Sequence, residues 1–154
     1  MEDLFKFLMI KTGRDFDEAE LAEMNPTQLA YVGDAIYEAF VRTYLVIKFK
    51  EPMRKLHKRS VDHVRAGSQS VALQIVIPIL SEDELYIVKR GRNTKSANIP
   101  ANAGMIEYRR ATAFESLLGY LYLSGRYERL FEIMWRALET NEPCEKESEV
   151  FWDK

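Results

Sequence analysis

Apolar residues recur at spacings of three and four along most of the chain, and no stretch alternates for long with a period of two. The first spacing lines one face of an α-helix, whereas a half-buried strand needs the second. The pattern therefore predicts an all-α fold. The expected helices cover approximately residues 26–46, 52–64, 68–77, 82–90, 106–123 and 126–138.

Signals at the ends of these segments support the helix boundaries. Asn25-Pro26-Thr27 is typical of a helix entrance, because proline is favoured in the first turn. Ser81 followed by Glu84 has the pattern of a capping box, and Pro78 ends the preceding helix. The polar stretch 92–104 is predicted to be a long loop, and loops of that length in compact domains are often functional.

The length and composition fit one folded domain. With 154 residues, of which 47% are hydrophobic, the chain can bury a core covering roughly 70% of the surface that it exposes when unfolded. No internal repeat or low-complexity tract is present. We expect one domain over residues 1–154, with its core at about 25–140 and an acidic tail at about 141–154.

The sequence predicts neither a membrane protein nor a secreted one. The longest apolar run, residues 71–80, is interrupted by Gln74 and Pro78 and is too short to span a bilayer. The first residues mix acids with apolar side chains, unlike a secretory leader. The single cysteine, Cys144, cannot form an internal disulfide or supply a structural zinc site. We therefore expect a cytoplasmic protein.

The charge is distributed unevenly along the chain. The net charge is −2, but residues 48–110 carry +7, whereas residues 1–25 carry −4 and residues 126–154 carry −3. A central block this basic can present a positive face to phosphates although the whole protein is acidic. A solvated helical surface would give the same pattern, so charge alone leaves both interpretations open.

Two carboxylates interrupt otherwise apolar helical segments. Asp34 lies within residues 29–36, and Glu115 lies beside an apolar stripe in residues 111–118. A carboxylate among apolar neighbours needs a partner, and we expect Asp34 in a crowded, partly buried setting. Two carboxylates on two core helices can share a magnesium ion, which accepts one or two protein carboxylates and keeps several waters.

The alternative is that each acid is paired locally. Asp34 could bond to Tyr31 or Tyr37, and Glu115 could pair with the arginines at 109–110 in the preceding turn. Without further information the residues themselves do not exclude this arrangement.

Two other residues in the first segment invite separate explanations. Glu38 precedes Arg42 by one turn, which favours an ordinary i,i+4 ion pair over a place at the metal. Gly33 in mid-helix costs about 1 kcal/mol relative to alanine, which close approach of another backbone would explain, although chance is the alternative.

The two acid-bearing segments resemble the catalytic domain of the ribonuclease III family, which has a Gly-Asp-Ala stretch in its signature helix and an Asp-x-x-Glu in a later helix. The resemblance to the Mini-III branch is closer and covers most of residues 25–140. Four motifs in the same order carry it: Leu29-Ala-Tyr-Val-Gly-Asp-Ala-Ile-Tyr-Glu38, Leu56-His-Lys-Arg-Ser60, Val88-Lys-Arg-Gly-Arg-Asn-Thr-Lys-Ser96 and Tyr108-Arg-Arg-Ala-Thr-Ala-Phe-Glu-Ser-Leu-Leu-Gly-Tyr-Leu-Tyr122.

This resemblance implies a ribonuclease III-type helical domain with Asp34 and Glu115 as catalytic and metal-binding residues, holding Mg²⁺, for which Mn²⁺ can substitute. Water would attack the phosphodiester and leave 5′-phosphate and 3′-hydroxyl ends. The chain departs from standard ribonuclease III at three positions where that family has further acids. These positions hold Thr27, Ala30 and Thr112.

The resemblance also implies a substrate and an assembly. It points to a homodimer that cleaves double-stranded RNA and matures large-subunit (23S) ribosomal RNA. As in Mini-III, we expect no double-stranded-RNA-binding domain after the catalytic unit, and we expect the domain itself to hold RNA through basic and polar side chains that contact phosphates. The candidate RNA-binding residues are Lys58, Arg59, Lys89, Arg90, Arg92, Asn93, Lys95, Arg109 and Arg110.

Three other functions compete with this one. The three missing acids leave room for a non-catalytic RNA- or ribosome-binding module of the same fold. A helical nucleotide hydrolase would also use paired carboxylates, but such enzymes gather acids at i,i+3 and i,i+4 on one helix, which this chain lacks. Without the resemblance, a structural helical dimer would be the leading interpretation.

Overall fold

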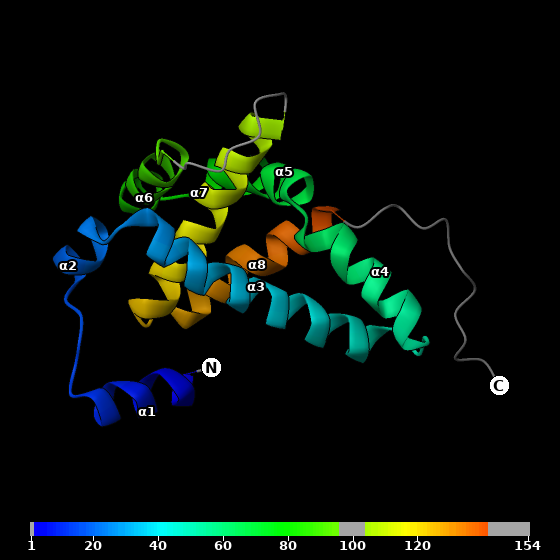
Figure 1. The fold of residues 1–154 in the computed structure, drawn as a ribbon, viewed down its shortest axis with the longest axis horizontal. Helices are drawn as coiled ribbons and strands as arrows, with labels where there is room; N and C mark the ends of the chain where they lie inside the picture. Colours follow the sequence, from blue (N-terminus) through cyan, green and yellow to red (C-terminus); the bar gives the residue numbers. More distant parts are fainter. Residues whose placement is uncertain (1, 96–103, 142–154) are drawn as a thin grey trace.

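The computed structural model describes residues 2–95 and 104–141, and throughout these ranges the regular structure is helical, as predicted. The helices pack around α7, which passes through the middle of the molecule (Figure 1). The elements are α1 (Glu2–Thr12), α2 (Glu18–Glu23), α3 (Pro26–Lys48), α4 (Met53–Val64), α5 (Ala66–Val76), the 3₁₀ helix η1 (Ile77–Ile79), α6 (Glu82–Arg92), α7 (Gly104–Leu123) and α8 (Tyr127–Asn141).

The predicted helix boundaries are confirmed where capping signals were present. Asn25 caps α3, because its side-chain oxygen accepts a hydrogen bond from the Thr27 backbone N–H at 3.0 Å. Ser81 and Glu84 form the predicted capping box of α6. The buried Glu84 carboxylate also accepts two hydrogen bonds from Arg129 at 2.9 Å, so the same residue attaches α6 to α8.

Helices α3 and α7 make the most extensive contact in the fold, and glycines allow it. A Cβ atom on Gly33 would lie 1.8 Å from the Glu115 carbonyl oxygen, and one on Gly119 would lie 1.9 Å from the Leu29 carbonyl oxygen. Neither distance is compatible with a side chain, so the two backbones touch directly at both places. The close backbone approach expected at Gly33 is confirmed.

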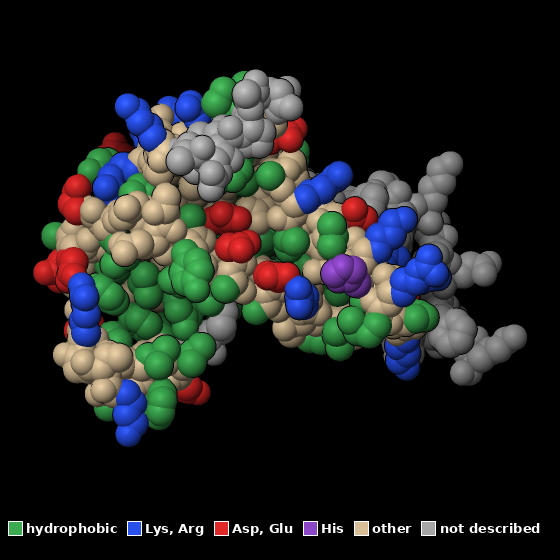
Figure 2. Space-filling model, in the orientation of Figure 1, with side chains coloured by type: hydrophobic (Ala, Val, Ile, Leu, Met, Phe, Trp, Pro, Cys, Tyr) green, Lys and Arg blue, Asp and Glu red, His purple; other side chains and the backbone are tan. Residues whose placement is uncertain are grey.

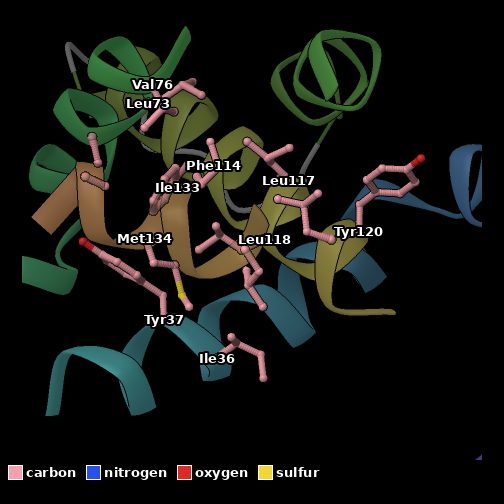
Figure 3. Packing of buried hydrophobic residues seen from close by; sticks show 14 of the residues in the cluster. Ile36, Tyr37, Leu73, Val76, Phe114, Leu117, Leu118, Tyr120, Ile133 and Met134 are labelled. Carbon is pink, nitrogen blue, oxygen red and sulfur yellow. The ribbon is translucent and has the colours of Figure 1, made fainter. Parts of the chain in front are cut away.

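The hydrophobic core lies between α3, α5, α7 and α8 (Figure 3). Tyr37 of α3 and Phe114 of α7 pack edge to face at its centre, with ring centroids 5.1 Å apart. Leu73 and Val76 of α5 close the core from another side. The core therefore fixes α3 and α7, the helices of both candidate acids, relative to each other.

Two helices precede the expected core, and the sequence analysis did not place them. Helix α1 has no fully buried residue and reaches α7 through Phe5, whose ring lies 5.6 Å from that of Tyr122. It lies at the edge of the molecule (Figure 1). Helix α2 has six residues, too few for a helical pattern to register.

Three other expectations concern the loop at 92–104, the acidic tail and the absence of a membrane span. The predicted loop at 92–104 is described only up to Lys95, because residues 96–103 lie outside the described residues. The acidic tail expected at 141–154 also lies outside them, apart from Asn141 at the end of α8. Among the helices described, none combines the length and the apolar character needed to cross a membrane.

Candidate active site

The structure brings Asp34 and Glu115 together across the contact between α3 and α7. Asp34 follows Gly33 directly, and Gly33 packs against the Glu115 backbone. The two carboxyl groups lie close enough that the negative charge of Asp34 raises the pKa of Glu115. The sequence prediction that two carboxylates on two core helices meet is therefore supported by geometry.

Burial and like charge both destabilise the ionised form of Glu115. Its side chain is half-buried, and burial is the larger cause that raises its pKa to about 8. The Asp34 carboxylate is the second cause, and only a hydrogen bond from Gln69 acts in the opposite direction. The protein side chains at the site therefore do not by themselves stabilise two negative charges.

The setting expected for Asp34 is corrected by the structure. Asp34 is exposed rather than crowded and partly buried. The reason is its position on α3: Gly33, Ile36 and Tyr37 face the core, and Asp34 projects beside that face toward solvent. The apolar residues next to Asp34 in the sequence therefore pack into the core and leave its carboxylate uncovered.

The local pairings considered for the two acids are not found within residues 2–95 and 104–141. The Tyr37 hydroxyl is buried with no partner there, and burial raises its pKa. No ion pair joins Glu115 to the arginines at 109–110 in the same ranges. Glu38 does pair with Arg42, as predicted, so its charge is already balanced.

The donor set fits a divalent cation of the magnesium type. A cation beside Asp34 and Glu115 would offset the repulsion that raises the Glu115 pKa, and magnesium accepts two carboxylates together with waters. The described residues contain no cluster of three or more His, Cys, Asp or Glu side chains suited to a metal. Two protein carboxylates are thus the full acidic set in the described part of the site.

The three positions that lack acids have other roles in the fold. Thr112 donates a hydrogen bond to the Tyr108 carbonyl oxygen at 3.0 Å, and Thr27 donates to the Asn25 side chain at 2.8 Å. Ala30 is buried. None of the three adds an anionic ligand.

Most of the candidate RNA-binding residues lie on the surface of the protein. Figure 2 shows acidic side chains at the middle of one face, with Lys and Arg over α6 and α4 beside them. Arg109 lies six residues before Glu115 on α7, about 9 Å along the helix axis. The exposed candidates are Lys58, Lys89, Arg92, Asn93, Lys95 and Arg109, and Arg110 is half-buried.

Two of the nine candidates make contacts within the protein. The Arg90 guanidinium donates hydrogen bonds to the carbonyl oxygens of Ala22, Glu23 and Met24, where α2 ends, at 2.5, 3.3 and 3.0 Å. Arg59 pairs with Glu51 at 2.8 Å and lies over the Phe49 ring. We therefore assign both side chains to support of the fold.

Sequence reasoning missed two features of this region. Gln69, buried on α5 beside Glu115, looks like any polar helix residue in the sequence. A largely apolar groove of about 560 Å³ runs between α1 and α3, with Leu8, Tyr31 and Ile36 among its lining residues and Asp34 and Glu38 at its edge. The apolar spacing of residues 4–10 was the available signal for the groove.

Comparisons with known proteins identify similar chains. Residues 27–126 match the family model described as "Ribonuclease III domain". A Mini-ribonuclease 3 from Clostridium tetani is 47% identical over 79% of this chain and 82% of its own length. One from Brevibacillus brevis is 49% identical over 73% and 84%. The crystal structure of a Fusobacterium nucleatum protein superposes with a TM-score of 0.69 at 30% identity, covering 78% of this chain and 96% of that one.

Proposed function

The chain belongs to the ribonuclease III family, in its Mini-ribonuclease 3 branch, and from this premise we propose that it is a metal-dependent endoribonuclease for double-stranded RNA. The observation that carries the proposal is the meeting of Asp34 and Glu115 at the α3–α7 contact, with no compensating cation among the described side chains. Such a pair is suited to Mg²⁺, or to Mn²⁺ in its place.

The two acids contribute differently. Glu115 is half-buried and fixed by the backbone contact with Gly33, so it offers a carboxylate at a defined place. Asp34 is exposed, so its carboxylate is accessible to a phosphodiester from solvent. Magnesium, when bound, supplies an activated water and stabilises the leaving oxygen, which gives 5′-phosphate and 3′-hydroxyl ends.

The basic side chains around the acids support a duplex RNA substrate. Double-stranded RNA is recognised mainly through phosphates and 2′-hydroxyls across its wide minor groove. The exposed Lys89, Arg92 and Lys95 at the end of α6, with Lys58 on α4 and Arg109 on α7, can contact phosphates without reading bases. We propose the precursor of large-subunit ribosomal RNA as the physiological, cytoplasmic substrate, as the resemblance to Mini-III implies.

The groove between α1 and α3 supports a homodimer. Tyr31, Leu8 and Leu4, which line this groove, are 84%, 49% and 54% exposed. Large apolar side chains that gather on one exposed face in this way are unusual, and Figure 2 shows apolar side chains over this part of the molecule. We propose that a second copy of the chain covers this face. Since Asp34 lies at its edge, the two sites of such a dimer would lie near the interface.

The test is cleavage of a long double-stranded RNA by purified protein with Mg²⁺, compared with Asp34→Asn and Glu115→Gln proteins whose helical content matches the parent. Cutting by the parent and by neither variant would support the assignment. RNA binding without cutting by all three would instead support a non-catalytic RNA-binding module, the alternative that the small acidic set favours.

A further inference from the structure

Among residues 2–95 and 104–139, Gln69 is the one side-chain amide that is buried, and it lies beside the acid pair. It lies in the first turns of α5, is 1% exposed, and donates a hydrogen bond from Nε2 to the Val64 carbonyl oxygen at 2.9 Å. Helix α5 packs against α7, which carries Glu115. Gln69 is therefore held between the end of α4 and the acid-bearing helix.

The Val64 carbonyl fixes the orientation of this amide. A rotation of the amide by 180° would place Oε1 against the Val64 oxygen, and two acceptors would then face each other. The nitrogen has a second N–H, and the Gln69 amide lies close enough to the Glu115 carboxyl group to lower its pKa. Because a lower pKa means that the ionised carboxylate is stabilised, the end of the amide that faces Glu115 is this nitrogen.

The other end of the amide has no partner in the described part of the chain. The Oε1 atom is buried, and none of the described residues donates to it. A buried acceptor left without a donor is destabilising, so such atoms usually meet a water or a ligand. The unmet acceptor of Gln69 therefore calls for a water or a ligand group next to this amide.

We propose that Gln69 is a positioning residue that orients the Glu115 carboxylate toward a divalent cation and accepts a hydrogen bond through Oε1 from a water at that site. The inference rests on the proposed function, because the cation is part of it. In metal sites, residues that hydrogen-bond to the ligands typically change metal affinity 10- to 100-fold when they are removed.

The test measures Mn²⁺ binding without RNA, from the free-ion signal in electron paramagnetic resonance. Gln69→Met keeps the size of the side chain and removes both polar ends, so Mn²⁺ affinity should fall about 10-fold or more. Gln74→Met on the exposed side of the same helix is the matched control and should bind like the parent. Asp34→Asn should bind least.

The outcomes separate the two proposals. Equal Mn²⁺ affinity of Gln69→Met and parent would overturn the role of Gln69 and leave the metal site standing, and a lower melting temperature with unchanged affinity would show a structural role only. Absence of Mn²⁺ binding by the parent would overturn the metal site and the role of Gln69 with it.

A second measurement needs no variant and therefore covers the case in which Gln69→Met does not fold. In ¹⁵N–¹H spectra of the parent protein, the Gln69 side-chain amide signals should shift when Mg²⁺ is added, because the Glu115 carboxylate and the water at Oε1 are rearranged. The Gln74 side-chain signals should stay in place. Unmoved Gln69 signals at a Mg²⁺ concentration that supports cleavage would contradict the proposal.

Discussion

Gly33 and Glu115 touch through their backbones, so closely that a Cβ atom on Gly33 would lie 1.8 Å from the Glu115 carbonyl oxygen. This contact places Asp34, the next residue, beside the Glu115 side chain. The relative position of the two proposed catalytic acids therefore depends on a residue that has no side chain.

Gly33→Ala should destabilise the protein although alanine is the better helix former. The gain of about 1 kcal/mol in helix propensity is outweighed by overpacking, which costs about 1–3 kcal/mol even between side chains and more against a fixed backbone. We expect a lower midpoint in urea unfolding and loss of cleavage. Gly67→Ala is the control, because a Cβ there meets only the Glu107 side chain at 3.6 Å, and its midpoint should not fall.

The metal-free protein should lose stability as the pH rises from about 5 to about 8. The folded-state pKa of Glu115 is raised to about 8 from its ordinary value of 4.5, so the folded protein binds more protons than the unfolded one in this window. Asp83, whose pKa is lowered to about 2, acts only at more acidic pH. Thermal unfolding of Glu115→Gln should lack the decline, and an equal decline in this variant would contradict the assignment.

Mg²⁺ should stabilise the protein more at pH 8 than at pH 5. At pH 5 the ion must displace a proton from Glu115, whereas near pH 8 that cost is largely gone. Melting temperatures with and without Mg²⁺ at the two pH values measure the difference. Glu115→Gln should show little Mg²⁺ stabilisation at either pH, and a Mg²⁺ effect independent of pH would place the ion elsewhere.

Substitutions of Arg90 and Arg92 should have different effects, although both residues lie near the end of α6. The first should lower stability and the second should weaken RNA binding. Arg90→Ala removes hydrogen bonds from a charged group to three carbonyl oxygens, so the free energy of unfolding should fall by about 1.5–3 kcal/mol. Arg92→Ala should leave it unchanged, because Arg92 is exposed. It should weaken RNA binding and reduce the slope of log affinity against log salt by about 1. Unchanged stability in Arg90→Ala together with a stability loss in Arg92→Ala would contradict both assignments.

Tyr31→Glu should convert the proposed dimer into a monomer. The substitution introduces a charge on the apolar face between α1 and α3. Light scattering after size-exclusion chromatography gives the mass directly. Tyr86→Glu is the control, because Tyr86 is also exposed but lies on α6, where its hydroxyl contacts Glu23. A monomeric parent would refute the dimer itself.

The sequence predicted those parts of the fold that depend on local pattern. The capping residues Asn25 and Ser81 and the spacing of apolar positions located the helices of the core, because these signals act within a few residues. Helices α1 and α2 were missed, since one is short and the other buries no residue fully. Long-range geometry carries no such local signal.

The sequence predicted which residues form the candidate site, but not how exposed they are or what they contact. The motifs identified Asp34 and Glu115, and mid-helix Gly33 indicated a close contact, but the exposure of Asp34 depends on how α3 is rotated against the core. The burial of Gln69 and the contacts of Arg90 depend on which helices become neighbours. Each of these facts required the packed structure.

The two glycine contacts between α3 and α7 limit how close the helices that carry the active-site acids can come. Gly33 and Gly119 bring the main chains of the two helices into direct contact, so backbone atoms set the closest approach of the helices, and the core side chains hold them there. An exchange of one apolar residue for another elsewhere on the two helices should therefore change the separation of the acids less than a side chain at either glycine would.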